Sequence, residues 1–140
     1  MKVIHFEIPG EPQGKGRPRF SSKTMRTYTP TQTANYENLG KVVYQQASDG
    51  FQFADDAMLT MVITAHYSIP KSASKKKALM MVSEKIKPTK KPDIDNIVKV
   101  IADALNKIAY RDDSQIVRCT VEKRYSHKPR VEVWLADIDP

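Results

Sequence analysis

The chain has 140 residues, 40% of them hydrophobic and 28% charged, and its formal net charge is +7. This length predicts one domain over residues 1–140 with a substantial core, and the excess of 23 Lys and Arg over 16 Asp and Glu favours a nucleic-acid partner. No apolar run approaches the roughly 18 residues of a membrane span, and the N-terminus lacks a signal-peptide pattern, so we expect a cytoplasmic protein. Cys119 is the only cysteine, which excludes an intramolecular disulfide and a cysteine-based zinc site.

The chain begins with a predicted strand and a basic loop. Residues 2–8 alternate in polarity, and Pro9 and Gly10 end the strand that this alternation predicts. Residues 10–28 contain several Gly and Pro and one acid, so they predict a loop. The cations of this loop are Lys15, Arg17, Arg19, Lys23 and Arg26.

A helix is predicted next. The Thr-Pro-Thr sequence at 29–31 is typical of a helix start, because proline is favoured in the first turn, and Asp-Gly at 49–50 ends the helix. Helical spacing predicts that its buried stripe contains Tyr36, Leu39, Val43 and Ala47.

The middle of the chain predicts a strand and a lysine-rich helix. Residues 59–67 alternate, and Pro70 ends that strand. Ser74 can cap a helix that reaches Ile86 within the lysine-rich stretch 71–91. Residues 87–91 then form a stiff loop.

The last third predicts one more helix and two strands. Asp95 or Asn96 can cap a helix whose apolar stripe runs from residue 97 to 108. Alternating residues at 117–121 and 131–135, with a turn at 126–129, predict an antiparallel hairpin. Together the elements predict an α+β domain: a small mixed β-sheet of about four strands, about three helices and a C-terminal β-hairpin.

Two acidic pairs stand out in this basic chain, Asp93 with Asp95 and Asp112 with Asp113. In an extended segment, residues two apart point to the same side, so Asp93 and Asp95 can converge on one ion. A strand that returns beside the helix start can bring one residue of the second pair close to Asp93. Carboxylates that hold a divalent metal on a cationic surface are what a Mg²⁺-dependent nuclease needs.

The residues also allow other interpretations. The acidic pairs can be a helix cap and a turn, and Lys99 can contact a phosphate or pair with Asp95 along the helix. An EF-hand starting at Asp93 fails, because Val98 stands where glycine is needed and Ala104 where glutamate is needed. The histidines show no zinc spacing: they are His5, His66 and His127.

The segment Lys91–Lys99 (KPDIDNIVK), with Asp103–Asn106 and Asp112–Ile116, closely resembles the core of the RusA family of Holliday-junction resolvases. The segments 14–20 and 28–30 also resemble the N-terminal part of that family. The resemblance implies catalytic roles for Asp93, Asp95, Lys99 and Asp113, with Asp112 as an accessory metal ligand. It further implies Mg²⁺ dependence and a homodimer that nicks opposed strands of a four-way junction.

We expect DNA to be held mainly through its phosphates by two basic segments. Their cations are Lys15, Arg17, Arg19, Lys23, Arg26, Lys90 and Lys91. Two alternatives stay open at this stage: a nuclease for flaps or forks, and a non-catalytic DNA-binding accessory of recombination. The stripe that contains Leu39 and Val43 is a candidate dimer interface.

Overall fold

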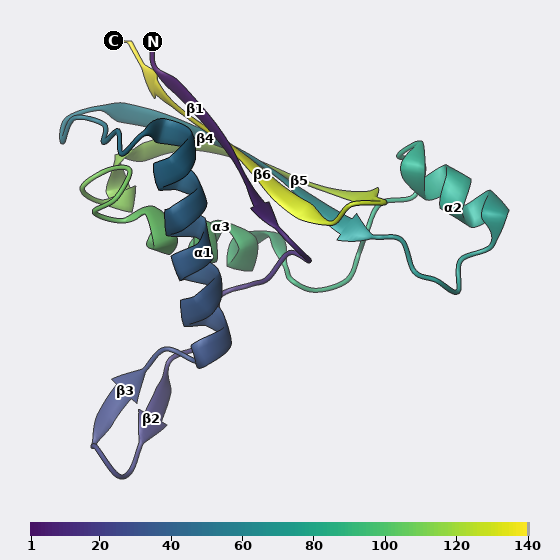
Figure 1. Ribbon diagram of the computed structural model, residues 1–140, viewed down its shortest axis with the longest axis horizontal. Helices are drawn as coiled ribbons and strands as arrows, with labels where there is room; N and C mark the ends of the chain where they lie inside the picture. The colour runs from purple at the N-terminus through teal and green to yellow at the C-terminus, as the bar shows by residue number, and fades with distance from the viewer. Residues whose placement is uncertain (140) are drawn as a thin grey trace.

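A four-stranded mixed β-sheet forms the centre of the protein (Figure 1). The computed structural model describes residues 1–139. The strand order is β1-β6-β4-β5. The strands are β1 (Val3–Pro9), β4 (Met58–Ser68), β5 (Ile116–Ser126) and β6 (Arg130–Ile138). The mixed α+β architecture predicted from the sequence is therefore confirmed.

Strand β4 lies inside the sheet and pairs with β5 in parallel and with β6 in antiparallel orientation. A parallel pair needs a long crossover, and the chain between β4 and β5 supplies it with α2 (Lys75–Val82) and α3 (Ile94–Leu105). Strands β5 and β6 are consecutive and antiparallel, as predicted. They are not bonded to each other, because the crossover returns β5 to one edge of β4 and leaves the other edge to β6.

Helices α1 (Thr31–Ser48) and α3 pack against each other and cover one face of the sheet (Figure 1). Alternating residues of β1, β4 and β6 point to this face and are buried, whereas the edge strand β5 has no fully buried residue, and His5 and Glu7 of β1 point to the other face. The core beneath the helices includes Ile4, Phe6, Ile8, Tyr44, Leu59, Met61, Ile63, Ile97, Ile101, Leu105, Val133 and Leu135.

Helix α1 buries a face that shares Tyr36 with the predicted stripe and has Val43 at its edge, but that is rotated away from Leu39 and Ala47. Its buried residues are Thr33, Tyr36, Gly40, Tyr44 and Ser48, whereas Leu39 is 36% exposed and Ala47 is exposed. Gly40 gives the reason: a Cβ there would lie 3.5 Å from Ile8 Cδ1 and 3.6 Å from Ala104 Cβ. Close approach at a residue without a side chain rotates the helix away from the stripe that apolar spacing alone predicts.

The other two helices begin where polar residues precede them. Ser74 caps α2 as predicted, because its hydroxyl accepts a hydrogen bond from Lys77 N at 3.2 Å. Helix α3 begins at Ile94, so Asp93 holds the N-cap position that was predicted for Asp95 or Asn96. Asp95 therefore belongs to the first helical turn.

The predicted loop 10–28 contains a small hairpin of its own. Strands β2 (Arg19–Ser21) and β3 (Arg26–Tyr28) pair in antiparallel orientation, and the turn between them includes Met25 at φ 56°. Figure 1 shows that this hairpin projects beyond the N-terminal end of α1. Each strand has three residues, too short for a clear alternating pattern in the sequence. No helix among residues 1–139 has the length and apolar character that crossing a bilayer requires.

Candidate active site

Asp95, Lys99 and Asp113 line one cavity of about 330 Å³ between α3 and the start of β5. Asp95 and Lys99 lie one turn apart on the same face of α3. Asp113 begins a short 3₁₀ helix, η1 (Asp113–Gln115), which leads directly into β5. The rest of the lining is mainly apolar and includes Val98, Ala102, Ile116 and Cys119.

Asp93 holds the N-cap position of α3, two residues before Asp95, and is not among the residues that line this cavity. The sequence interpretation placed Asp93 and Asp95 in one extended segment, whereas in the structure the helix begins between them. The Asp93 side chain makes no capping hydrogen bond. Both carboxylates are exposed near the helix N-terminus, where the dipole favours negative charge.

Side chains of β4 and β5 form hydrogen bonds with the loop that precedes Asp93. Tyr67 of β4 donates its hydroxyl hydrogen to Pro92 O at 2.8 Å, and Lys123 of β5 donates to Lys90 O at 2.6 Å. Burial, followed by the nearby charges of Asp93 and Glu11, raises the pKa of Tyr67 to about 12. The phenol therefore stays a hydrogen-bond donor throughout the neutral range.

The turn before β5 is organised by Gln115, whose role the sequence interpretation missed. Its carboxamide oxygen accepts from Arg111 N at 3.0 Å and from Asp112 N at 3.3 Å. Its nitrogen donates to Ala54 O at 2.9 Å and Ala57 O at 3.1 Å. The Asp112 carboxylate accepts from Ser114 N, which completes a capping box, and hydrogen bonding by the Ser114 side chain and then by its backbone N–H lowers the pKa of that carboxyl. The Asp-x-x-Gln spacing of such a box was the available signal.

Lys99 belongs to a network of charges that joins α3 to α1. Its ammonium lies 3.3 Å from Asp103 Oδ1, so its ion pair is with Asp103 and not with Asp95. Lys15 lies 3.1 Å from Asp103 Oδ2 and 2.8 Å from Glu37 Oε2. Desolvation favours the neutral Lys15 amine, yet hydrogen bonds to the two carboxylates outweigh it and raise the pKa of Lys15. Lys99 remains 60% exposed at the cavity.

The aspartates fit a hard divalent cation such as Mg²⁺. Carboxylate oxygens are its preferred protein ligands, and it keeps several waters, which suits an open site. Within residues 1–139 the side chains of Asp95 and Asp113 accept no hydrogen bond, so their oxygens are free for an ion. The carboxylates of Asp95 and Asp113 are less tightly gathered than the side chains of His5, Glu7 and Glu132 on the other face of the sheet. The charge of that second group is balanced by Arg130, which lies 2.8 Å from Glu132.

Most of the predicted DNA-binding cations are exposed. Arg17 and Arg19 line a second cavity beside the start of α3, Lys23 and Arg26 lie on the β2–β3 hairpin, and Lys91 precedes Pro92. Within residues 1–139 no ion pair engages any of them, nor Lys90. Lys15 differs, because its ammonium is already paired with two carboxylates.

The family described as Endodeoxyribonuclease RusA matches residues 9–136. The chain belongs to this family. A relative from Bacillus subtilis (strain 168), the uncharacterized protein YqaN, is 35% identical over 142 residues and 99% of both chains. A second relative, crossover junction endodeoxyribonuclease rusA of Lactococcus phage r1t, is 26% identical over 133 residues, which cover 94% of this chain and 92% of the relative.

Membership confirms the resemblance drawn from the segments Lys91–Lys99 and Asp112–Ile116, both of which lie inside the matched region. It makes the chain a member of an endodeoxyribonuclease family. Two elements that are consecutive in this RusA-family chain, α3 and the 3₁₀ turn before β5, contribute Asp95 and Asp113 to one cavity.

Proposed function

We propose that this RusA-family protein is a Mg²⁺-dependent, structure-selective endodeoxyribonuclease that resolves four-way DNA junctions by paired symmetric nicks. The observation that carries the proposal is the single cavity lined by Asp95, Lys99 and Asp113, with Asp93 at the adjoining helix start. An apolar wall with few charged groups is typical of sites where electrostatic effects on a reacting group are strong.

Each polar residue then has a chemical role. Asp93, Asp95 and Asp113 would hold the metal, and Asp112 contributes mainly by capping the turn that carries Asp113. Bound Mg²⁺ supplies Lewis-acid polarisation of the phosphate and a water of lowered pKa. The exposed ammonium of Lys99 can approach the scissile phosphate or the leaving oxygen and stabilise negative charge there. Asp103 keeps that ammonium close to the cavity.

DNA binding is supported by the free cations around the site. Arg17, Arg19, Lys90 and Lys91 lie near the α3 start, and Lys23 and Arg26 extend the positive surface along the projecting hairpin. Contacts to phosphates follow the shape of a branched DNA without reading its sequence. The formal net charge of +7 favours the same substrate.

Paired nicking is best served by a homodimer. One catalytic cavity cuts one strand per engagement, and a second copy keeps the opposed strand at high effective concentration. A four-way junction has its own two-fold symmetry, which a two-fold dimer matches. Leu39 is exposed on α1 and stays a candidate part of the interface, whereas Val43 is partly buried against the core and the exposed Val42 is a better second candidate.

The deciding experiment compares a synthetic four-way junction with linear duplex, a flap and a fork, each with and without Mg²⁺. We expect symmetric nicks in the junction only, loss of cleavage without metal, and loss of cleavage with retained binding in Asp95→Asn. Asp56→Asn is the matched control, because Asp56 is exposed and outside the cavity. Preferred cutting of flaps or forks, or binding without cleavage, would support one of the two alternative functions instead.

The dimer has a separate test. Wild-type subunits mixed with Asp95→Asn subunits should nick one strand of a junction that cannot branch-migrate and leave the opposed strand intact. A protein that sediments as a monomer at working concentration and still makes paired nicks would contradict the dimer.

A further inference from the structure

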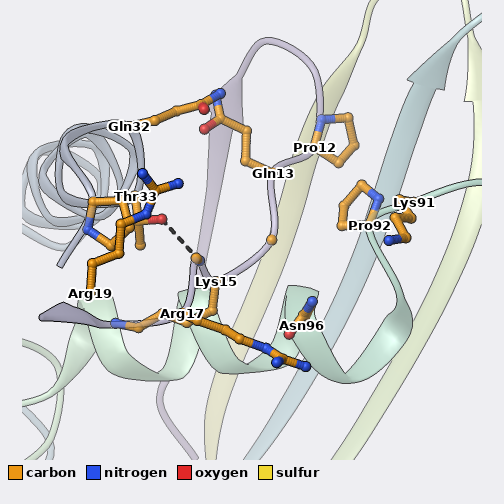
Figure 2. A pocket seen from close by; sticks show the side chains of 13 residues that line it. Pro12, Gln13, Lys15, Arg17, Arg19, Gln32, Thr33, Lys91, Pro92 and Asn96 are labelled. Atoms are coloured by element: carbon orange, nitrogen blue, oxygen red, sulfur yellow. Dashed lines mark hydrogen bonds between the residues drawn. The ribbon is translucent and has the colours of Figure 1, made fainter.

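A second cavity, of about 520 Å³, lies beside the N-terminal end of α3 (Figure 2). Its size falls within the range of small-molecule sites, roughly 300–1,000 Å³. Three separate parts of the chain form it: the segment from Pro12 to Arg19, the first turn of α1, and the residues around Pro92.

The cavity has a specific chemical composition. Gln13, Gln32 and Asn96 bring three carboxamides to its lining, and within residues 1–139 none of their side chains makes a hydrogen bond. Figure 2 shows the amide ends of Gln13 and Gln32 turned toward one another. The apolar rings of Pro12, Pro30 and Pro92 form further parts of the lining, and Arg17, Arg19 and Lys91 supply positive charge.

The glycine-containing segment of this lining is firmly placed. Gly16 N donates to Thr33 Oγ1 at 2.9 Å, the contact drawn in Figure 2, and Lys15 N donates to Asn96 O at 3.3 Å. A Cβ on Gly16 would lie 2.6 Å from Thr33 Oγ1, and one on Gly14 would lie 3.0 Å from Pro92 Cβ. A side chain at Gly16 would therefore force the segment or Thr33 to move, and a side chain at Gly14 would require Pro92 or Asn96 to shift slightly.

The cavity adjoins the candidate active site through two residues. Pro92 directly precedes Asp93, and Asn96 directly follows Asp95. On a helix, consecutive residues point about 100° apart, so Asn96 faces this cavity while Asp95 faces the catalytic one. A DNA strand whose phosphate is at Asp95 would thus place a neighbouring nucleotide at the cavity.

We propose that this cavity binds one unpaired nucleobase next to the scissile phosphate, and that Gln13 and Gln32 read its hydrogen-bonding edge. Carboxamides offer a donor and an acceptor together, which is the pattern that base edges require. The prolines provide surfaces against which a planar base can lie, and the arginines can contact the adjoining phosphate. Freeing a base from its stack costs least where pairing is already interrupted, as at a branch point. This inference rests on the proposed nuclease function and adds a preference for certain bases at the cut.

The first test maps cleavage positions on four-way junctions whose branch point can migrate through many sequences. We expect the wild-type protein to cut at a subset of sequences. Gln13→Ala and Gln32→Ala should reduce that preference by about tenfold, the discrimination typical of one paired hydrogen-bond contact. Gln46→Ala is the matched control, because Gln46 is exposed near the other end of α1. Cleavage without sequence preference, or preference unchanged in both variants, overturns the inference while the nuclease function stands.

The second test does not depend on cleavage. A junction with 2-aminopurine at the branch point is titrated with protein that carries Asp95→Asn, alone or with Gln32→Ala or Gln46→Ala. Capture of the base should change the fluorescence with Asp95→Asn and with the Gln46 control, and by several-fold less with Gln32→Ala at equal DNA occupancy. Equal signals for all three proteins contradict a base site here. If the wild-type protein cuts no branched DNA, the proposed function fails, and this titration still decides whether the cavity holds a base.

Discussion

Tyr67 and Pro92 are joined by a hydrogen bond of 2.8 Å, from the phenol hydroxyl to the carbonyl oxygen of the residue that precedes Asp93. Tyr67 is only 2% exposed and lies on the central strand β4, so a rigid part of the core holds the start of α3. Lys123 Nζ lies 5.0 Å from the centre of the same ring while it donates to Lys90 O. The candidate metal ligand at the helix cap is thus placed from the sheet below it.

Replacing Tyr67 by Phe should separate this positioning effect from catalysis itself. Loss of one buried hydrogen bond is expected to lower the free energy of unfolding by about 1 kcal/mol. Because the hydroxyl places Asp93, the Mg²⁺ concentration for half-maximal cleavage should rise by roughly tenfold, as for other residues that orient metal ligands. Denaturant unfolding and a Mg²⁺ titration of cleavage measure the two effects. An unchanged metal requirement with lowered stability would reduce Tyr67 to a purely structural role.

Alkaline pH should destabilise the wild-type protein more than Tyr67→Phe. The folded pKa of Tyr67 is about 12, whereas an unfolded tyrosine titrates near 10. Between these values the unfolded state loses its proton first, so the stability that Tyr67 contributes is complete below pH 10 and is lost as pH rises toward 12. The measurement is the free energy of unfolding of both proteins from pH 9 to 12. Because the other tyrosines are common to both, the difference isolates Tyr67. Parallel curves would be inconsistent with the raised pKa.

The two adjacent aspartates should differ sharply when each is changed to Asn. Asp113 lines the cavity with Asp95 and Lys99, whereas the Asp112 carboxylate accepts from Ser114 N at 3.0 Å and lies outside the lining. We expect Asp113→Asn to lose at least about 100-fold in cleavage, since loss of a ligand should exceed the effect of losing its support. Asp112→Asn should retain most of the activity, because Asn can still cap the turn. Single-turnover cleavage of a junction measures both. If the two variants lost cleavage activity equally, Asp112 would be as important a metal ligand as Asp113.

Much of the fold could be predicted from local patterns. Alternation identified β1 and β4, the Asp-Gly pair identified the end of α1, and Ser74 identified the start of α2. What the sequence did not reveal depends on contacts between distant segments. The insertion of β4 between β5 and β6 is a property of the whole sheet. The rotation of α1 follows from Gly40 against Ile8, a close approach that an apolar count does not record.

In the candidate site, too, the residue types could be predicted from the sequence, whereas their arrangement in space could not. The acidic pairs and Lys99 were visible as residue types, and the resemblance to the RusA family favoured a catalytic role for them over a helix cap, a turn and a helical ion pair. Their relative directions were not visible, since they depend on whether the helix begins before or after Asp95. The pairing of Lys15 with Glu37 and Asp103 also escaped prediction, because each partner lies on a different helix.

Gln115 should behave as a positioning residue of the second acidic segment. Its carboxamide forms hydrogen bonds with four backbone groups, two in the turn and two in the segment 54–57. Leucine has a similar volume but can form none of these hydrogen bonds. We expect Gln115→Leu to lower cleavage by roughly 10–100-fold and to raise the Mg²⁺ requirement. Gln115→Glu keeps the acceptors and should restore part of the activity. If the wild-type protein, Gln115→Leu and Gln115→Glu all require the same Mg²⁺ concentration, Gln115 does not act through Asp113.

The cations of the glycine-containing segment should separate into one that stabilises the fold and two that bind DNA. Arg17 and Arg19 are exposed and free of ion pairs within residues 1–139. The double variant Arg17→Ala, Arg19→Ala should therefore bind the junction more weakly. The slope of log affinity against log salt concentration should fall in magnitude by about one for each lost phosphate contact. Lys15 is different, because its ammonium holds Glu37 and Asp103 together at 2.8 and 3.1 Å.

Lys15→Met should therefore cost about 1–3 kcal/mol of unfolding free energy, between the values for exposed and buried ion pairs, and leave the salt slope unchanged. Lys128→Ala, at the exposed turn between β5 and β6, is the control for loss of a charge distant from the α3 start. Binding at several salt concentrations and denaturant unfolding give both quantities for each variant. Lys15→Met could instead reduce the slope of log affinity against log salt concentration as much as one arginine variant does. That result would show that Lys15 leaves its carboxylates and contacts a phosphate when DNA binds.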